Sequence, residues 1–433
     1  MVFGINGLRN IQRLAACLAL MLSAQAAFAD SGFTPQRRLG YTQGDQWEPA
    51  LATDARGHIY ILFPQYGQIP ACPACTVPTM AFLRSADNGK SWEPPQVLVA
   101  VSSGQFDAQV KVDPVDGQTL YVSWLQGRHD VVVGRSQDFG QSWYFTVAEH
   151  SPEKTIDKPV LAVRGPSVYV SFNQEQTLSI AASHDYAQNF SSTVVNPDEG
   201  PGWSLAASAT VDPSNNVYFS WTAYPQRHFT QPASVFVSRS ADGGRNWSTT
   251  LLDVSSAAPN CSAEVCSAGF LSSQIALASD DSGTVYAVWN AGTMAGGPER
   301  IFFSSSTNGG TWSTKVDVSN AAVGVEHCFP TVAAGRAGDV RIAWMDTRTR
   351  DEAGRPLWNT FYRASTNGGA TWSTESKLSG PVRGYDYIRP SGFLFPFGNL
   401  FSLGIDNLGI THAAWGEGRN YQTPGSIWYS HEQ

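Results

Sequence analysis

Short apolar runs broken by turn residues recur along the whole chain. In each, an apolar stretch leads to an Asp, Gly or Asn turn, and a second apolar stretch ends in an aromatic residue; residues 51–63 are the first example. Gly, Trp and β-branched residues are plentiful, and no long segment has the 3.6-residue period of an amphipathic helix. The pattern predicts an all-β protein.

This unit occurs seven times, at intervals of roughly 50 residues, which is the period of a β-propeller blade. The aromatic residues that end its second strand are Phe63, Trp124, Phe172, Trp221, Trp289, Trp344 and Trp415. Each unit is expected to contain four strands in the order A, B, C and D. The repeats predict a seven-bladed β-propeller of four-stranded antiparallel blades, which occupies residues 30–433 as a single domain.

A second pattern lies between the third and fourth predicted strands. Residues 85–92 read Ser-Ala-Asp-Asn-Gly-Lys-Ser-Trp, and the same spacing returns at 136–143, 240–247 and 365–372. Residues 305–312 are interpreted as a variant with Thr307 in the acidic place, and 183–190 as a degenerate copy. The short Asp or Asn side chain can accept backbone N–H groups just downstream, and Gly tolerates a positive φ. These carboxylates are therefore interpreted as turn architecture and not as catalytic groups.

The motif S-x-D-x-G-x-T/S-W resembles the Asp-box, or bacterial neuraminidase repeat, of sialidases and other secreted β-propellers. The resemblance implies a propeller whose Asp-box turns lie on the face away from the ligand site. Sialidases use three Arg residues for the substrate carboxylate, an Asp acid/base, and a Tyr nucleophile assisted by a Glu. They also carry an Arg-Ile-Pro motif before the first box, and this chain has none there.

Only six of the seven units contain a box, and the seventh lacks a fourth strand. Residues 33–39 (Phe-Thr-Pro-Gln-Arg-Arg-Leu) resemble residues 92–98 (Trp-Glu-Pro-Pro-Gln-Val-Leu), which lie in the fourth strand of the first unit. We therefore expect residues near 33–40 to complete the last blade. Such pairing closes the ring and removes exposed sheet edges.

Residues 1–29 have the form of a secretory signal peptide. Arg9 and Arg13 precede an apolar run that is too short to span a bilayer, and Ala27-Phe28-Ala29 is a small-residue cleavage site. The predicted location is periplasmic or extracellular, without membrane insertion. The net charge of −8 makes nucleic acid an unsuitable partner for the chain as a whole. We expect a monomer that binds a carbohydrate ligand.

Five cysteines follow the predicted signal peptide, in a compartment that permits disulfides. Cys72 and Cys75 are expected to close a small loop, and Cys261 with Cys266 is a plausible second pair. Cys328 then remains single beside His327. A metal site at that Cys–His pair needs further ligands that the spacing does not supply, so no metal and no cofactor are predicted.

The predicted ligand face contains the loops between strands B and C and those that lead into strand A. Irregular loops on a rigid scaffold are where binding residues concentrate. Arginines suit an anionic ligand because the guanidinium group pairs bidentately with a carboxylate. The candidate substrate-binding residues are Arg128, Arg227, Arg300, Arg348, Arg389 and Arg419.

Acidic and Tyr side chains in these loops can serve proton transfer or nucleophilic attack. The candidate catalytic residues are Asp346, Glu417 and Tyr421, and the loops into strand A add Asp107, Asp157 and Lys158. The alternative is that these charges are solvated or form salt bridges between blades. For Asp346 and Arg348, a structural staple and a functional role are equally plausible.

Three functions fit these observations. The first is a sialidase-like exo-glycosidase that acts on an acidic glycan, with a polysaccharide lyase acting on uronates as a related alternative. The second is a non-catalytic propeller that binds a glycan or a protein. The third, a metal-dependent enzyme built on His327 and Cys328, ranks last.

Overall fold

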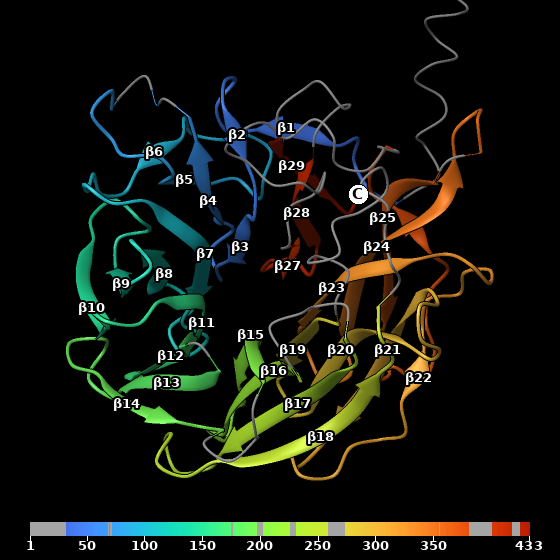
Figure 1. Ribbon diagram of the computed structural model, residues 1–433. Helices are drawn as coiled ribbons and strands as arrows, with labels where there is room; N and C mark the ends of the chain where they lie inside the picture. Colours follow the sequence, from blue (N-terminus) through green and yellow to red (C-terminus); the bar gives the residue numbers. More distant parts are fainter. Residues whose placement is uncertain are drawn as a thin grey trace, which may run out of the picture.

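The computed structural model describes most of the chain after the predicted signal peptide. The described residues are 32–67, 69, 72–174, 176–196, 202–225, 231–258, 273–354, 356–380, 401–417 and 425–433. Within them the secondary structure is entirely β. The strands form seven antiparallel sheets arranged around a common centre (Figure 1).

The strands of each sheet follow one another along the chain. Blade 1 contains β2 (Asp45–Gln46), β3 (Ala50–Thr53), β4 (Ile59–Tyr66), β5 (Thr79–Ser85) and β6 (Gln96–Val97). Blade 2 contains β7 (Gln105–Val112), β8 (Leu120–Gln126), β9 (Asp130–Ser136) and β10 (Tyr144–His150). Blade 3 contains β11 (Ile156–Arg164), β12 (Ser167–Gln174), β13 (Thr177–Ser183) and β14 (Ser191–Val194). Blade 4 contains β15 (Trp203–Val211), β16 (Val217–Tyr224), β17 (Ala233–Ser240) and β18 (Ser248–Ser255).

The remaining blades repeat this order. Blade 5 contains β19 (Ile275–Ser279), β20 (Val285–Gly292), β21 (Glu299–Ser306) and β22 (Val316–Asp317). Blade 6 contains β23 (His327–Ala334), β24 (Val340–Arg350), β25 (Pro356–Ser365) and β26 (Ser376–Lys377). Blade 7 contains β27 (Phe401–Ile405), β28 (Thr411–Glu417), β29 (Ser426–His431) and β1 (Arg37–Leu39). In blade 1, β2 and β3 pair with successive parts of β4 and together take the innermost position.

The innermost strands form a closed ring. β3 contacts β7, and contacts continue in order through β11, β15, β19, β23 and β27, which returns to β3. Figure 1 shows these strands around the centre, with the other strands of each blade further out. The predicted seven-bladed β-propeller is confirmed.

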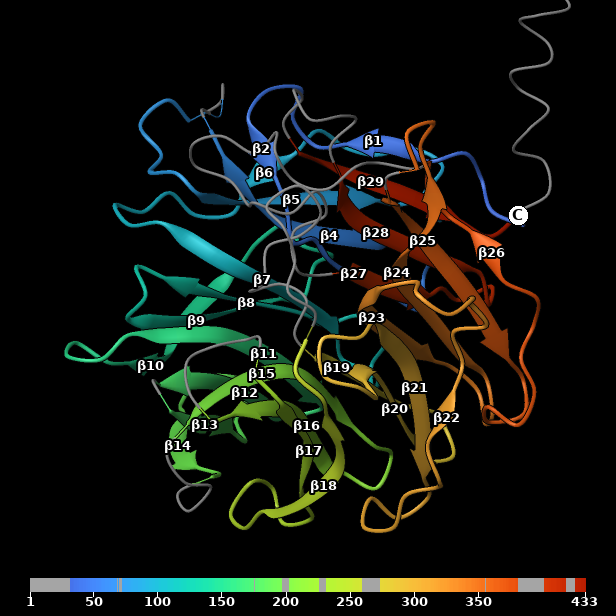
Figure 2. The same ribbon diagram turned by 45° about the vertical axis from the view of Figure 1, so that its right-hand side comes forward.

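The last blade is completed by a segment from the start of the described chain. β1 pairs antiparallel with β29, and the Cα partners include Arg37 with Tyr429 and Leu39 with Ile427. Figure 2 shows β1, β29, β28 and β27 side by side in this sheet. Phe33 is 3% exposed and packs edge-on against Tyr362 of blade 6, with ring centroids 4.9 Å apart. The predicted closure by residues near 33–40 is therefore confirmed.

The core lies between neighbouring blades. The Trp side chains that end the second strand of five blades are fully buried: Trp124, Trp221, Trp289, Trp344 and Trp415. Most buried clusters draw their residues from adjacent sheets, for example blades 6 and 7 together with Phe33. Burial of an aromatic side chain of this size stabilises the folded state by about 2–3 kcal/mol. Packing between blades thus makes the ring rigid.

The Asp-box segments form the turns between the third and fourth strands. In the first box, Asp87 accepts the backbone N–H of Ser91 at 2.9 Å, and Ser85 Oγ accepts the N–H of Gly89 at 2.9 Å. Trp92 donates its indole N–H to the carbonyl of Gly89. These bonds satisfy the local polar groups of a tight turn, as the spacing predicts.

Two variant boxes keep this design. In the degenerate copy, Asp185 accepts the N–H of Asn189 at 3.0 Å, and Ala187 adopts a φ of 65° where other boxes have Gly. In the fifth box the expectation of Thr307 in the acidic place is wrong. Asn308 accepts the N–H of Thr311 at 2.8 Å, because this turn is one residue shorter and the register begins at Ser306.

Cys72 and Cys75 form the expected disulfide in the β4–β5 connection. Cys328 is a free, buried thiol. The predicted signal peptide and the Cys261–Cys266 pair lie outside the described residues. In the described part of the chain, no helix is long and apolar enough to cross a membrane.

Candidate functional site

The innermost strands enter the ring through β-bulges. In β7, β11 and β23 the register with the second strand shifts near the first residues of the strand. At these bulges Asp107, Lys158 and Phe329 have φ values of 55°, 51° and 50°, and Glu48 has 52° at the corresponding place before β3. Positive φ is strained for non-glycine residues, and such strain clusters at functional sites.

These bulges lie on the face opposite the Asp-box turns. In an antiparallel blade, the start of the first strand and the turn between the second and third strands share one end. The turn between the third and fourth strands lies at the other end. Arg128, in the turn between β8 and β9, therefore lies on the same face as Asp107. The predicted separation of ligand face and Asp-box face follows from this strand order.

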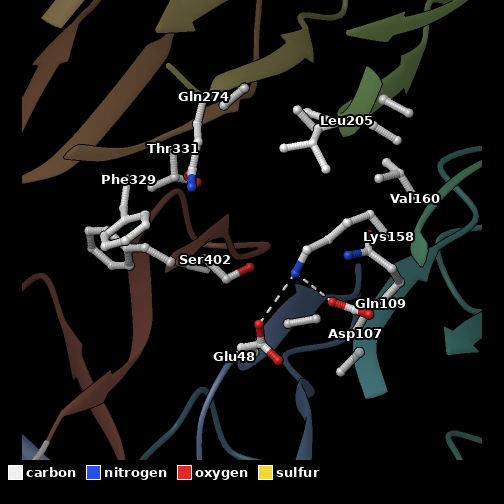
Figure 3. A pocket seen from close by; sticks show the side chains of 18 of the residues that line it. Glu48, Asp107, Gln109, Lys158, Val160, Leu205, Gln274, Phe329, Thr331 and Ser402 are labelled. Carbon is white, nitrogen blue, oxygen red and sulfur yellow. Dashed lines mark hydrogen bonds and ion pairs between the residues drawn. The ribbon is translucent and has the colours of Figure 1, made fainter. Parts of the chain in front are cut away.

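The bulges line a cavity of about 690 Å³ at the centre of the ring, within the size range of small-ligand sites. Figure 3 shows Glu48, Asp107 and Lys158 converging on it, with Leu205 and Gln274 across from the two acids. The wall from blades 1–3 thus carries acids and bases. The wall from blades 4–7 carries mainly apolar and small polar side chains, including Leu205, Ile275, Phe329, Thr331, Phe401 and Ser402.

Lys158 is the centre of the charged wall. Its Nζ lies 2.7 Å from Oδ1 of Asp107 and 3.6 Å from Oε1 of Glu48, so one ammonium joins three blades. The two acids are almost fully buried. The neighbouring carboxylates raise the pKa of Lys158 against the opposing effect of burial, so it stays charged. Because both oxygens contact the same Nζ, Oδ1 of Asp107 and Oε1 of Glu48 are no further apart than the sum of the two Nζ–O distances.

Burial raises the pKa of two acids in this cluster, Glu48 and Asp157. Burial raises the pKa of Glu48 to about 8, although the charge of Lys158 opposes that shift. The pKa of Asp157 is also raised, by burial and then by the charge of Asp107. Burial and the nearby carboxylate of Glu48 raise the pKa of Tyr66. Near neutral pH the site therefore holds a protonated carboxylic acid close to the Lys158–Asp107 ion pair.

Such a site can donate and accept protons at one ligand. A carboxylic acid that is neutral at pH 7 is a general acid, and an ionised neighbour can act as a base. Lys158 and Arg128 add positive charge, and the Arg128 guanidinium lies 5.8 Å from the Phe106 ring centroid. Among the described residues, no group of three or more His, Cys, Asp or Glu side chains is arranged to hold a metal ion.

The structure separates the arginines that the sequence analysis grouped together. Arg128 lines the cavity. Arg300 instead donates to Asp317 at 2.8 Å and to the carbonyl of Ala321 at 2.9 Å, and it does not line the cavity. Arg227, Arg389 and Arg419 lie outside the described residues.

Arg348 is held within blade 6. Its guanidinium donates to the buried carboxylate of Asp346, with a shortest distance of 2.6 Å, and also to Glu375. It also lies over the Phe361 ring at 3.8 Å from the centroid. Asp346 further accepts the indole N–H of Trp344 at 3.0 Å. These contacts form a staple between strands, and neither residue lines the cavity.

Glu417, at the end of β28, is 3% exposed and does not line the cavity. It accepts the indole N–H of Trp415 at 2.6 Å, and burial raises the pKa of Glu417 to about 8. Tyr421 lies outside the described residues. The catalytic roles assigned to Asp346, Glu417 and Tyr421 remain predictions.

Two residues of the charged wall were missed in the sequence. Glu48 belongs to no motif, and Tyr66 lies at the end of β4, beyond the recurring aromatic position. A signal was nevertheless present. Glu48 stands two residues before β3, as Asp107 stands two residues before Gln109, the matching position in β7. Alignment of the repeats would have placed it beside Asp107 and Lys158.

The overall fold has relatives among solved structures. A protein of unknown function from Dyadobacter fermentans superposes with a TM-score of 0.52 at 13% identity, over 92% of this chain and 98% of that chain. A polysaccharide lyase described as an ulvan lyase gives 0.52 at 12% identity, over 91% and 95%. An intramolecular trans-sialidase from Ruminococcus gnavus gives 0.47 at 12% identity, over 92% and 97%. No protein-family model matches the chain, and no curated protein matches its sequence. At these identities the similarity to the first two structures shows the propeller fold alone.

Proposed function

We propose that this protein is a secreted carbohydrate-active enzyme that cleaves an acidic glycan at the mouth of the central cavity, as an exo-glycosidase. The observation that carries the proposal is the cluster of Glu48, Asp107 and Lys158 at the edge of a ligand-sized cavity. Fold alone does not determine activity, so the argument depends on this site.

Most glycosidases use two carboxyl groups in different protonation states. Glu48, with its raised pKa, would donate a proton to the glycosidic oxygen as that bond breaks. Asp107, held beside Lys158, would attack the anomeric carbon as that bond breaks, and Glu48 would then take a proton from the water that releases the sugar from Asp107. The two acids contact one ammonium at 2.7 and 3.6 Å, so the contacting oxygens lie closer together than the about 6.5–9.5 Å of inverting glycosidases, which favours this retaining scheme.

A second candidate is β-elimination at a uronate. It is favoured by Tyr66 and Arg128, which line the same wall of the cavity. In that reaction the guanidinium of Arg128 would neutralise the sugar carboxylate. A base would remove the proton from the carbon adjacent to that carboxylate, and Tyr66 would protonate the leaving oxygen. One solved structure of similar fold, at a TM-score of 0.50 and 12% identity, is an ulvan lyase bound to a glucuronate–rhamnose 3-sulfate chain.

The two reactions give different products from the same test. Purified protein would be incubated with fluorogenic sialosides and uronides and with uronate-containing polysaccharides. Hydrolysis releases sugars without unsaturation, whereas elimination produces an unsaturated sugar that absorbs ultraviolet light. If the wild-type protein turns over none of these substrates, a propeller that binds a glycan without cleaving it is the better interpretation.

Substitution of Glu48 tests the assigned site. Glu48→Gln removes the acid but keeps the size of the side chain, and kcat is expected to fall about 100-fold or more. The matched control is Glu93→Gln, which removes an acid paired with Arg84 beside the first Asp-box turn. The control is expected to keep wild-type activity. Equal activity of both variants would contradict the role of Glu48.

A further inference from the structure

The inner part of the cavity contains a second lysine, Lys111 of β7. It lines the cavity of about 690 Å³ and also a second cavity of about 190 Å³. It therefore lies where the two spaces meet, deeper in the ring than the bulge residue Asp107 on the same strand.

The corresponding positions of the other blades hold small residues. Lys111 is the Cα partner of Tyr121 in β8. The residues that pair with the equivalent position of each second strand are Ala52, Ala162, Thr210, Ala278, Ala333 and Gly404. None of these side chains is longer than that of Thr. At this level of the ring, Lys111 thus has the longest side chain and room around it.

Lys111 has no counter-charge among the described residues. No ion pair or hydrogen bond joins its ammonium to the described chain, and burial lowers the pKa of Lys111 without an opposing carboxylate. The nearby Asp280 is occupied by the hydroxyl of Tyr286 at 2.7 Å and the N–H of Gly338 at 2.8 Å. Lys111 is partly buried, and a charge removed from water in this way is costly unless something pairs with it.

The contrast with Lys158 identifies which of the two lysines is available to a ligand. Lys158 already contacts Asp107 and Glu48, so an incoming anion would have to compete with them. Asp280 and Asp281 line the second cavity with Lys111, but no carboxylate of the described residues forms an ion pair with it. We infer that Lys111 is the receptor for the acidic group of the glycan, a carboxylate or a sulfate, at the inner end of the cavity.

This inference rests on the proposed function and makes it more specific. The acidic group would enter first and pair with Lys111, and the rest of the glycan would extend outward past Glu48 and Asp107. A charge-assisted hydrogen bond of this kind contributes about 1.5–3 kcal/mol. The enzyme would accordingly select a terminal acidic sugar over its neutral counterpart.

The test measures binding and does not depend on turnover. Glucuronic acid, a glucose sulfate and glucose would be titrated calorimetrically into wild-type protein, Lys111→Met and Lys111→Arg. Lys111→Met is expected to weaken the binding of one or both acidic sugars about tenfold or more and to leave glucose unaffected. If the affinity for glucuronic acid falls, the recognised group is a carboxylate, and if the affinity for glucose sulfate falls, it is a sulfate. Lys111→Arg is expected to recover part of that affinity.

Two controls separate recognition from folding. Lys315→Met removes a lysine that pairs with Asp253 outside the cavity, and its affinities are expected to equal those of the wild type. The melting temperature of Lys111→Met is expected to match or exceed that of the wild type, because an unpaired and partly buried charge is removed.

The outcomes distinguish this inference from the proposed function. If Lys111→Met binds both acidic sugars as tightly as the wild type, or if the wild type binds neither, the inference is overturned. If binding depends on Lys111 but no glycan is cleaved, the receptor role stands and the proposed catalysis fails.

Discussion

The ammonium of Lys158 lies 2.7 Å from the carboxylate of Asp107, although the two residues stand on neighbouring blades, 51 positions apart. Glu48, on a third blade, lies 3.6 Å from the same ammonium. The positive charge of Lys158 thereby links three residues of strained backbone conformation on three blades. The pair consequently contributes both to the ring and to the proposed chemistry.

Replacement of Lys158 by Met is expected to destabilise the protein strongly. It leaves Asp107 buried without its counter-charge and removes the contact to Glu48, and loss of one partner of a buried pair costs about 3–5 kcal/mol. Urea unfolding of the variant would measure the loss in the free energy of unfolding. Lys315→Met, which breaks a more exposed pair with Asp253, is expected to cost at most about 1 kcal/mol. Similar losses for the two variants would show that the Lys158 cluster is not a strong structural element.

The pH dependence of stability is expected to reflect buried glutamates such as Glu417. Its folded pKa is about 8, above the ordinary value of about 4.3, so the folded state binds its proton more tightly than the unfolded state does. Its contribution is present in full below about pH 4 and is lost as pH rises towards 8, by up to roughly 1.4 kcal/mol per pH unit.

Glu417→Gln isolates this contribution. Gln keeps an oxygen for the indole N–H of Trp415 and cannot ionise. The variant is expected to lose less stability than the wild type between about pH 5 and pH 8.5, as measured by urea unfolding at both values. Parallel losses in the two proteins would assign the pH dependence to other groups.

The Asp-box carboxylates are expected to matter for stability and not for activity. Asp138 accepts the backbone N–H of Ser142 at 2.8 Å and its hydroxyl at 2.5 Å, and these bonds hold the pKa of Asp138 at about 2. Asp138→Ala is expected to lower the free energy of unfolding by only about 1 kcal/mol, because the turn is exposed to solvent.

The chain supplies its own control for this prediction. Asn367 occupies the same place in blade 6 and accepts the N–H of Thr371 at 2.9 Å. Asp138→Asn is accordingly expected to lower the melting temperature less than Asp138→Ala does. A large loss of kcat in either variant, with folding intact, would indicate that the turn has a catalytic role.

Closure of the ring is expected to depend on Phe33. This side chain is 3% exposed and packs against Tyr362, and its backbone pairs with Glu432, just after β29. Phe33→Ala is expected to lower the free energy of unfolding by about 3 kcal/mol through lost burial and a cavity. Val323 is 100% exposed, and Val323→Ala should leave the melting temperature unchanged. A negligible effect of Phe33→Ala would mean that the packing of Phe33 adds little to closure of the ring.

Arg348→Ala separates a staple from a ligand contact. The substitution leaves the fully buried Asp346 without its ion-pair partner, so a loss of about 3 kcal/mol in the free energy of unfolding is expected. Because Arg348 does not line the cavity, KM of the folded variant should stay close to that of the wild type. A raised KM with unchanged stability would support the substrate-binding role predicted from the sequence.

The amino-acid sequence by itself determined the ring of seven blades. Local rules were sufficient: each box needs only its own side chains, as Asp87 with Ser91 shows, and each second strand contains its own buried aromatic. The closing strand was also recognisable, because residues 33–39 resemble the fourth strand of the first blade.

Only the tertiary structure decided which charges meet. Glu48, Asp107 and Lys158 are distant in the chain and come together because equivalent bulges of adjacent blades face one axis. Arg348 was a candidate for the ligand, yet it pairs with Asp346, two residues earlier, and Glu375 instead. Lys111 lacked any motif, and its position among small residues emerged only when seven strands were aligned in space. Turns depend on neighbours in sequence, whereas a central cavity depends on the closure of the whole ring.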